Sequence, residues 1–317
     1  MTGLPVALSE ARDGFATLDP SHRPLVSIVL PCFREPIPIL QRTLDSVLSQ
    51  TYPNIEIVVV VDDPGNAAIL THLKRQAEAD NCVRVVVNQH NLGAWGSYNR
   101  GVAEAKGELI AIQDADDVSA PNRIEALVGF LLQNPTVGVV GSGLEYVDAT
   151  SGRTLMMRNY PSDPGRAIRR YCPLAHGTTL RWAHLFKTHG GYDESRVYRH
   201  AADYELWCRW FARRVRMANV PDALYTYYQS DSNFKSQNVK AILRDTVRIK
   251  ARYSRALRFG IGDYLWLAAE TLASLLPARA VVAAFYALNR RRSAHMTRQG
   301  EADIDSTKGS AYTQLLK

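Results

Sequence analysis

Apolar runs of strand length alternate along the chain with longer segments of helical spacing. Between residues 24 and 143 the runs are Leu25–Leu30, Ile55–Val61, Val83–Val87, Leu109–Ile112 and Val137–Val140. In the intervening segments 39–48, 68–79, 94–105 and 123–132, apolar residues recur every three or four positions. This alternation predicts an α/β fold, a mostly parallel sheet with helices on both faces.

The alternation weakens after Gly143. Short strand-like pieces at Leu144–Val147, Thr178–Leu180 and Leu224–Tyr228 are mixed there with helical segments. Beyond Ser236 the pattern is helical. We therefore expect an N-terminal extension (1–23), an α/β domain (24–236) with halves 24–143 and 144–236, a basic amphipathic helical extension (237–292) and a polar tail (293–317).

Composition places the chain among globular proteins. It has 317 residues, of which 46% are hydrophobic, and a net charge of +7 from 38 Lys and Arg against 31 Asp and Glu. The four cysteines form no CxxC pair, so neither a zinc ribbon nor a disulfide framework is expected. Residues 1–20 lack the pattern of a secretory signal. Both observations favour the cytoplasm.

The segment Tyr264–Asn289 is largely apolar, but Glu270, Pro277 and Arg279 divide it into pieces too short to cross a bilayer. Arginines and lysines flank it, from Arg244 to Arg258 and again after residue 289. Apolar helices between basic flanks suit an anionic membrane surface, here the inner face of the cell membrane. The alternative is that these helices pack on the domain or form a homodimer. No nucleic-acid motif is present, so no nucleic-acid partner is expected.

Acidic residues follow two of the expected strands. Asp62 and Asp63 come after the second strand, and Asp114, Asp116 and Asp117 come after the fourth. Open α/β sheets bind ligands at the carboxyl ends of their strands, so the two groups are expected in one crevice. The alternative for the second group is an acidic turn that ends a strand and caps the next helix.

The spacing of Asp114 and Asp116 suits a hard cation. Residues i and i+2 of an extended chain point to the same side, so both carboxylates can face one ligand. Magnesium is typically held by one or two carboxylates together with substrate phosphates. The chain has neither GxxxxGK[ST] nor GxGxxG, which argues against P-loop NTPases and dinucleotide oxidoreductases. We therefore expect a metal ion held by carboxylates to bind the diphosphate.

An ordered set of motifs resembles glycosyltransferase family 2, inverting enzymes with the GT-A fold. The resemblance begins with Leu30–Glu35 at the end of the first strand and continues through Thr43–Pro53, Ile55–Asp63, Asn91–Gly93, Asn99–Gly101 and Lys106–Glu108 to the DxD-like Asp114–Asp117. Further landmarks of the acceptor side are His176–Thr179, Gly190–Glu194 and Asp203–Trp207. The resemblance covers residues 24–236, with 24–143 as the nucleotide-sugar half and 144–236 as the acceptor half.

The resemblance implies roles for individual residues. Asp114 is implied on the ribose or phosphate side, and Asp116 as ligand of Mg or Mn, with Asp114 beside it at the metal. The other implied nucleotide-sugar contacts are Pro31 and Phe33 in the base pocket, Glu35 beside them, and Asp63 at the base or ribose, with Asp62 as its alternative.

Asp203 matches the position that serves the family as general base. It would take the proton from an acceptor hydroxyl that attacks the anomeric carbon from the face opposite the leaving group. The chain departs from the family pattern at Ala202, where Glu is common, and at Arg34, where Asn is usual. Because Asp203 itself is present, the resemblance still implies a general base in this chain.

The sequence therefore predicts an inverting glycosyltransferase that uses a nucleotide-sugar donor, with a UDP-sugar favoured. A glycan or lipid-linked acceptor in cell-surface polysaccharide biosynthesis is expected. One alternative is a sugar nucleotidyltransferase, which usually needs a glycine-rich loop that Pro31–Glu35 does not supply. The other is a degenerate donor-binding or membrane-scaffold protein, suggested by Ala202 and Gln229.

Overall fold

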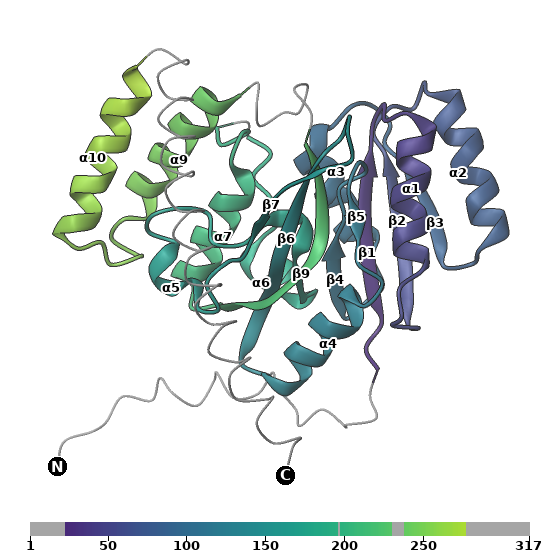
Figure 1. Ribbon diagram of the computed structural model, residues 1–317, viewed down its shortest axis with the longest axis horizontal. Coiled ribbons are helices and arrows are strands. Elements are labelled where there is room, and N and C mark those ends of the chain that lie inside the picture. The colour runs from purple at the N-terminus through teal and green to yellow at the C-terminus, as the bar shows by residue number, and fades with distance from the viewer. Residues whose placement is uncertain (1–22, 196, 230–237, 277–317) are drawn as a thin grey trace, which may run out of the picture.

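A single curled β-sheet runs through the computed structural model, which describes residues 23–195, 197–229 and 238–276 (Figure 1). The strands described are β1 (Val26–Cys32), β2 (Ile55–Val61), β3 (Val83–Val87), β4 (Leu109–Ile112), β5 (Val118–Ser119), β6 (Val137–Asp148), β7 (Thr154–Arg158), β8 (Leu180–Trp182) and β9 (Arg216–Gln229). They are arranged in the order β3-β2-β1-β4-β8-β6-β9-β5, with β7 paired to β6.

The first half of the sheet is parallel. β1 pairs in parallel with both β2 and β4, and β2 pairs in parallel with β3. β8 then runs antiparallel to β4 and β6, while β6 and β9 are parallel. The α/β class that the sequence predicts is confirmed, and β2, β3 and β4 have the expected bounds.

Helices flank this sheet (Figure 1). The described helices are α1 (Ile37–Leu48), α2 (Ala67–Ala79), α3 (Gly93–Glu104), α4 (Arg123–Gln133), α5 (Pro164–Ala167), α6 (His184–His189), α7 (Ala202–Ala212), α9 (Val239–Tyr253) and α10 (Ile261–Leu275), with a 3-10 turn, η1, at His176–Thr178. At the start of α2, the Asn66 side chain accepts a hydrogen bond from the Ile69 N–H. Among the described residues, no helix has the length and apolar character that a membrane span requires.

Two of the strands expected in the second half differ from the observed strands. Leu144–Val147 is no separate strand, because β6 continues without a break from Val137 to Asp148. The glycines at 141 and 143 interrupt its hydrophobic run, so the sequence pattern shows two pieces where the structure has one. Thr178–Leu180 is likewise wrong as a strand: it spans the end of η1 and the start of β8. The expected boundary at 143/144 therefore lies inside a shared strand.

Several expectations fall on residues outside the described ranges. These are the extension before residue 23, the basic flank after residue 289 and the polar tail 293–317. Helices α9 and α10 form the described part of the C-terminal helical extension (Figure 1). The four cysteines are free, as expected from their spacing.

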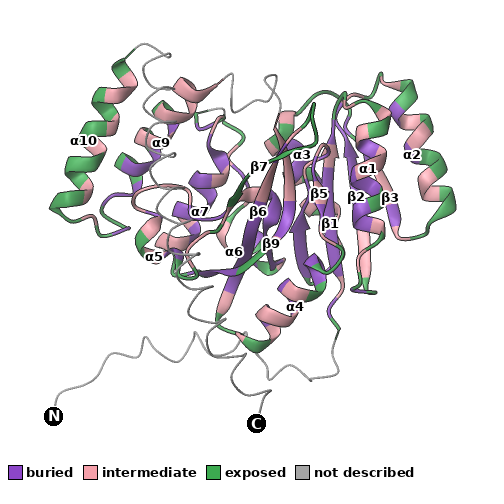
Figure 2. Ribbon diagram, viewed as in Figure 1, coloured by how far each residue is buried: buried purple, intermediate pink, exposed green. Residues whose placement is uncertain are grey.

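The parallel strands are buried on both faces (Figure 2). All five residues of Ile57–Val61 are fully buried; Ile57, Val59 and Val61 belong to the large core, whereas Val58 and Val60 pack with Val86 on the other face. Helix α3 covers this second face closely. A β-carbon added to Gly101 of α3 would lie 2.3 Å from Val29 Cγ1 and 3.0 Å from Val60 Cγ2.

Gly101→Ala is expected to lower the free energy of unfolding by about 1–3 kcal/mol, because the new methyl group overlaps Val29 of a strand that cannot move aside. Gly129→Ala is the matched control, since this second helical glycine has no atom within 4 Å of the new methyl group. The control should gain about 0.5–1 kcal/mol from helix propensity. Urea titrations of both variants test the packing, and equal effects would contradict it.

Candidate active site

The expected site residues of the first half follow the carboxyl ends of the neighbouring parallel strands β1, β2 and β4. Cys32 of β1 pairs with Val61 of β2, and Val29 of β1 pairs with Ile112 of β4. The segments that follow these strands therefore leave the sheet side by side. They carry the opening motif 33–35, the aspartates at 62 and 63, and the DxD-like turn 114–117.

Asp62 is turned toward its own protein. Its Oδ1 accepts hydrogen bonds from the Asn88 side chain and from the Leu92 N–H, both at 2.7 Å, and its Oδ2 accepts one from the Gly93 N–H at 2.9 Å. The residue is 4% exposed. Gly93, with a φ of +75°, begins α3 in a conformation that favours glycine. Asp62 thus fixes the loop that enters α3.

Asp63 has the opposite environment. Its Oδ2 accepts a hydrogen bond from Arg34 Nε at 2.8 Å, and this bond is the main cause that holds the pKa of Asp63 below its ordinary value. Arg34 in turn lies over the ring of Phe33, with 4.7 Å from its guanidinium carbon to the ring centre. Asp63, unlike Asp62, lies next to the opening motif.

The opening motif is an exposed turn at the end of β1. Phe33 is 36% exposed, so part of its ring can be reached from solvent. The Phe33 N–H donates a hydrogen bond of 2.7 Å to Glu35 Oε2, so Glu35 holds the turn closed. Pro31 is half-buried within β1 opposite Val60. The structure thus brings Phe33, Glu35 and Asp63 together.

Asp114 is held at the mouth of the site by aromatic side chains. Its Oδ1 accepts a hydrogen bond from the Tyr98 hydroxyl, and its own N–H donates one of 3.1 Å to the Tyr225 hydroxyl. His176 Nδ1 is 3.9 Å from Asp114 Oδ1. The Asp114 side chain is nevertheless 36% exposed, so one side of it remains open to a ligand.

Asp116 is more deeply placed. Burial, and next the negative charge of Asp114, raise its pKa to about 6. Its backbone is held from α1, because Arg42 Nη2 donates a 2.8 Å hydrogen bond to its carbonyl oxygen. Thr43 adds bonds to the carbonyl oxygens of Ala115 at 2.9 Å and Asp117 at 2.8 Å. Helix α1 therefore sets the shape of the DxD-like turn.

The third carboxyl of this turn serves the fold. Asp117 is fully buried, and its Oδ1 accepts a 3.0 Å hydrogen bond from the Tyr228 N–H of β9. Burial is the main cause that raises its pKa far above the ordinary value, followed by Asp114 and Asp116. Helix α4 begins only at Arg123, with Asn122 as its N-cap residue and no side-chain capping bond. The alternative of an acidic turn that caps this helix is therefore wrong.

Asp203 approaches the same region from the second half. It lies in the first turn of α7, half-buried, with Oδ2 at 3.9 Å from Cys172 Sγ. Tyr192 lies within electrostatic range of both Asp203 and Asp114: burial chiefly raises its pKa to about 12, and the two carboxylates add to the rise. Asp203 and Asp114 thus both lie near Tyr192.

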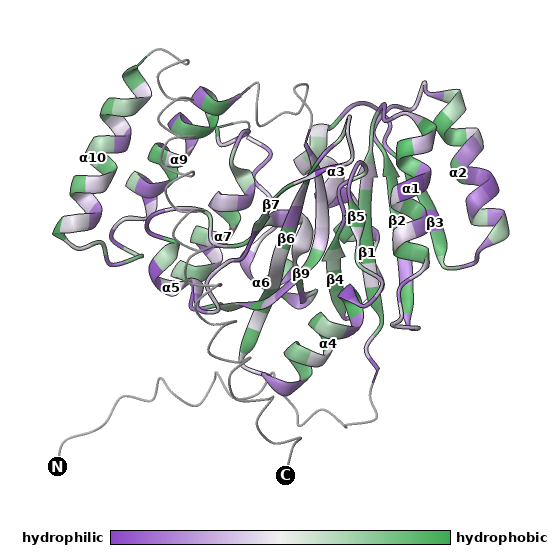
Figure 3. Ribbon diagram, viewed as in Figure 1, coloured by the Kyte–Doolittle hydropathy of each residue, from purple (hydrophilic) through white to green (hydrophobic). Residues whose placement is uncertain are grey.

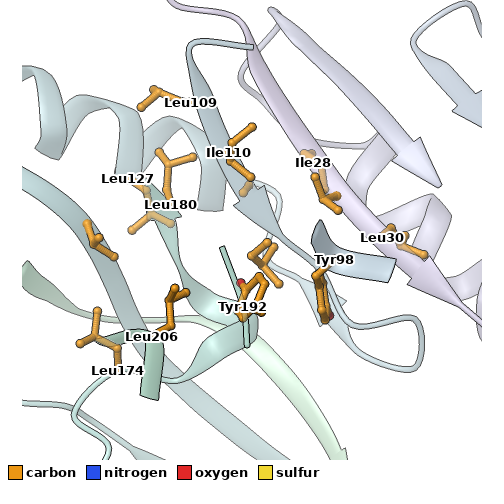
Figure 4. Packing of buried hydrophobic residues seen from close by; sticks show 14 of the residues in the cluster. Ile28, Leu30, Tyr98, Leu109, Ile110, Leu127, Leu174, Leu180, Tyr192 and Leu206 are labelled. Atoms are coloured by element: carbon orange, nitrogen blue, oxygen red, sulfur yellow. The ribbon is translucent and has the colours of Figure 1, made fainter. Parts of the chain in front are cut away.

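Tyr192 belongs to an aromatic cluster that sequence reasoning did not find. Its hydroxyl binds His176 Nε2 at 2.8 Å and accepts a 3.0 Å hydrogen bond from Arg181 Nη1. The rings of Tyr98 and Tyr192 lie side by side at the edge of the hydrophobic core, with 5.6 Å between their centres (Figure 4). His176, from the landmark His176–Thr179, is part of this cluster and lies beside Asp114.

Two fully buried arginines form hydrogen bonds with residues next to the site. Arg123 donates to Gln113 Oε1 at 2.9 Å and to the Ile112 carbonyl oxygen at 2.6 Å, at the end of β4. Arg181 of β8 donates to Tyr192. Arg123 also lies over the ring of Tyr225, whose hydroxyl accepts the hydrogen bond from the Asp114 N–H. Each arginine reads in the sequence as an ordinary surface residue, since no periodic pattern marks a buried arginine.

The donor set at the DxD-like turn fits a magnesium or manganese ion. The carboxylate of Asp114 is partly exposed, and the pKa of Asp116 is raised by burial and then by the charge of Asp114, so a bound cation would favour its charged form. Within the described ranges, no group of three or more His, Cys, Asp and Glu side chains could hold a metal by itself. Such an ion would therefore take further oxygen ligands from water and a diphosphate.

The Asp62→Asn variant should lose about 2–4 kcal/mol of unfolding free energy. An amide has one acceptor oxygen, so its NH₂ group would face one of the N–H donors of the loop at 88–93. The control is Asp63→Asn, whose partner Arg34 is 67% exposed, so that losing this exposed ion pair should cost far less than the change at Asp62. Thermal and urea unfolding compare them, and equal losses would contradict a structural role of Asp62.

Asp116→Asn should stabilise the metal-free protein at pH 7.5, by about 1–3 kcal/mol. The folded-state pKa of Asp116 is about 6, above its usual 3.8, so the charged form destabilises the fold at pH values above 6. As the pH falls from 6 toward 4, Asp116 becomes neutral in the folded protein and the advantage of the variant should vanish. Unfolding in EDTA across this range measures the effect. A variant less stable than wild type at pH 7.5 would contradict it.

The chain was compared with known proteins. The family model described as glycosyl transferase family 2 matches residues 27–207, more than half of the chain. EpsE of Bacillus subtilis, which carries the name of a glycosyltransferase, is 28% identical over 75% of this chain and 85% of its own. The O-antigen biosynthesis glycosyltransferase WbnJ of Escherichia coli is 27% identical over 58% of this chain and 72% of its own.

Solved structures show the same fold. TarS 1-349 of S. aureus in complex with UDP-GlcNAc is similar with a TM-score of 0.57 and 17% identity, over 74% of this chain and 70% of that one. Mannosyltransferase PcManGT of Pyrobaculum calidifontis, in complex with GDP-Man and Mn²⁺, has a TM-score of 0.55 and 20% identity, over 85% and 81%. Family model, relatives and fold agree with the motifs around the acidic turn: the chain belongs to glycosyl transferase family 2 and is a glycosyltransferase.

Proposed function

We propose that this glycosyltransferase transfers a sugar with inversion from a UDP-sugar to a glycan or lipid-linked acceptor in cell-surface polysaccharide biosynthesis. The observation that carries the proposal is the meeting of the opening motif, Asp63 and the DxD-like turn at the carboxyl ends of β1, β2 and β4. WbnJ, named for O-antigen biosynthesis, supports the pathway class, and the UDP-GlcNAc complex of TarS supports the donor class.

The nucleotide would lie on the opening motif. Phe33 offers an exposed ring to the base, with Pro31 and Glu35 shaping the turn behind it. Asp63, beside this motif, is the better candidate for the base or ribose contact than Asp62, whose oxygens already accept three hydrogen bonds from the protein. We assign Asp62 to the loop that shapes this pocket.

The diphosphate would lie over Asp114 and Asp116, which would hold Mg or Mn. When bound, the ion supplies positive charge that neutralises the leaving nucleoside diphosphate. The protein's own part is to fix the ligands: Tyr98 and His176 orient Asp114, while Arg42 and Thr43 fix the turn. Correctly placed ligands reduce the reorganisation that the reaction requires.

Asp203 would act as the general base. As the acceptor oxygen forms its bond to the anomeric carbon, the bond between that carbon and the phosphate oxygen breaks, and the acceptor proton passes to an Asp203 carboxylate oxygen. The diphosphate leaves with the bonding electrons from the opposite face, so the anomeric centre is inverted and a single base is sufficient.

The four free cysteines support a cytoplasmic location, where thiols stay reduced.

Asp203→Asn should lower kcat by about 10²–10⁴-fold, because an amide cannot accept the acceptor proton. Donor affinity should change little. The measurement is release of the free nucleotide (UDP, GDP, dTDP or CMP) from a panel of UDP-, GDP-, dTDP- and CMP-sugars in Mg or Mn, together with donor binding by calorimetry. Wild type should select one nucleotide, with UDP expected.

The matched control is Asp222→Asn, an exposed aspartate on β9, which should keep full activity. The Asp116→Asn variant should instead lose donor affinity. If Asp203→Asn turns over the preferred donor at the wild-type rate, Asp203 is not the base. If the preferred donor carries another nucleotide, the UDP assignment is wrong while the transfer chemistry remains.

A further inference from the structure

Helix α10 presents its apolar side away from the protein. Its outermost side chains include Ile261, Leu265, Leu272 and Leu275, which are 83%, 67%, 66% and 74% exposed. With Ala268 between them, these positions follow one another at steps of four and three residues, so they form one stripe along the helix. Figure 3 shows α10 at the outer end of the molecule with this hydrophobic composition.

The polar side of α10 is buried against the protein instead. Its charged residues are Asp263 and Glu270, and both point inward. Asp263 pairs with Arg169 at 3.2 Å and Arg170 at 2.9 Å, and Glu270 accepts 2.6 and 2.7 Å hydrogen bonds from the fully buried Lys250 of α9. The outer side of the helix therefore carries no charge at all.

This orientation is fixed rather than accidental. The Gly260 N–H donates a 3.0 Å hydrogen bond to Asp263 Oδ2 at the start of the helix, and Trp266 Nε1 donates one of 2.8 Å to Glu270. Rotating α10 to bury the leucines would break the ion pairs and leave Lys250 buried without its partner, which is costly. A water-exposed apolar stripe held in place by polar contacts is typical of a docking surface.

The charges around the stripe identify the kind of partner. Within residues 239–276 every acidic side chain is in an ion pair: Asp245 with His200 and Arg248, Asp263 with two arginines, and Glu270 with Lys250. Arg255 and Arg258 are exposed just before α10. The described surface of this end is therefore apolar and basic, a combination that complements anionic lipid headgroups above an apolar layer.

A second copy of the chain fits this surface less well. The stripe belongs to a helix of 15 residues, about 22 Å long and about 10 Å wide. One such face offers much less than the about 800 Å² per partner that a standard protein interface buries. Two copies would also bring their exposed arginines toward one another. A bilayer surface has neither restriction.

We propose that the outer face of α10, defined by Ile261, Leu265, Leu272 and Leu275, inserts into the interface of an anionic phospholipid membrane, with Arg255 and Arg258 at its headgroups. The helix lies along the surface. Through α9 this face is tied to α7: Tyr253 donates a 2.5 Å hydrogen bond to Glu205, and His200 pairs with Asp245 at 2.9 Å. Membrane binding would thus hold the half that carries Asp203 close to lipid-linked molecules.

Flotation of the full chain with vesicles tests this proposal without any sugar donor, so its outcome is independent of the proposed glycosyl transfer. Wild type should float with phosphatidylcholine vesicles containing about one-third phosphatidylglycerol at low salt. It should float much less with pure phosphatidylcholine, and less again at 0.5 M salt, where exposed charges are screened. The double variant Leu265→Glu/Leu272→Glu should bind about tenfold more weakly or worse, since both side chains must leave water.

The matched control is Leu155→Glu/Met157→Glu on β7, two exposed apolar residues that receive the same charges. The control should float like wild type, and circular dichroism should show both variants folded. Three results would overturn the proposal: no flotation of wild type, an equal loss in the control, or a dimeric mass in solution that becomes monomeric in Leu265→Glu/Leu272→Glu. The last would assign the stripe to a second copy.

Discussion

The mutual repulsion of carboxylates at the end of β4 is the constraint on which this structure depends. Asp114, Asp116 and Asp117 lie within four consecutive positions, and burial, followed by the charge of Asp114, raises the pKa of Asp116 to about 6. The protein tolerates them because each meets a different environment. Asp114 is exposed and bound by Tyr98, while Asp117 is buried and bound to β9. What remains is the unfavourable charge of the largely buried Asp116, which a bound cation would stabilise.

The same constraint explains the surroundings of the turn. Buried arginines at 123 and 181 place positive charge behind the acidic turn, and each is held by hydrogen bonds to strand ends or to Tyr192. Hydrogen bonds of tyrosine hydroxyl groups then link the sheet to the carboxylates. Because the core encloses these arginines and tyrosines, the carboxylates that would bind the metal are held in position before any substrate binds. Such preorganisation is how a binding site lowers a reaction barrier.

Much of the fold could be predicted from the sequence because the parallel strands are buried on both sides. Their uninterrupted β-branched runs leave a clear signal, as in β2. The strands of the second half were harder to predict. Glycines interrupt the hydrophobic run of β6 in the sequence, although β6 is one continuous strand in the structure. In the site, the aspartates were visible as acidic residues after strands. Arg181 and Tyr192 were not, because their roles depend on tertiary contacts between residues far apart in the chain.

Asp62 and α10 show where local patterns mislead. Adjacent aspartates at 62 and 63 look equivalent in sequence, yet one binds the loop before α3 and the other faces the opening motif. An amphipathic helix is normally taken to bury its apolar side. In α10 the partners of Asp263 and Glu270 reverse that orientation. In both cases the decisive information is which polar partner lies nearby.

We propose that Asp114 and Asp116 bind the diphosphate side while Asp203 serves the acceptor side. Calorimetric titration of UDP into wild type, Asp116→Asn and Asp203→Asn, each with and without Mn²⁺, separates these roles. We expect metal-dependent binding of UDP that is kept in Asp203→Asn and lost in Asp116→Asn. Binding that is independent of metal, or equally strong in Asp116→Asn, would contradict it.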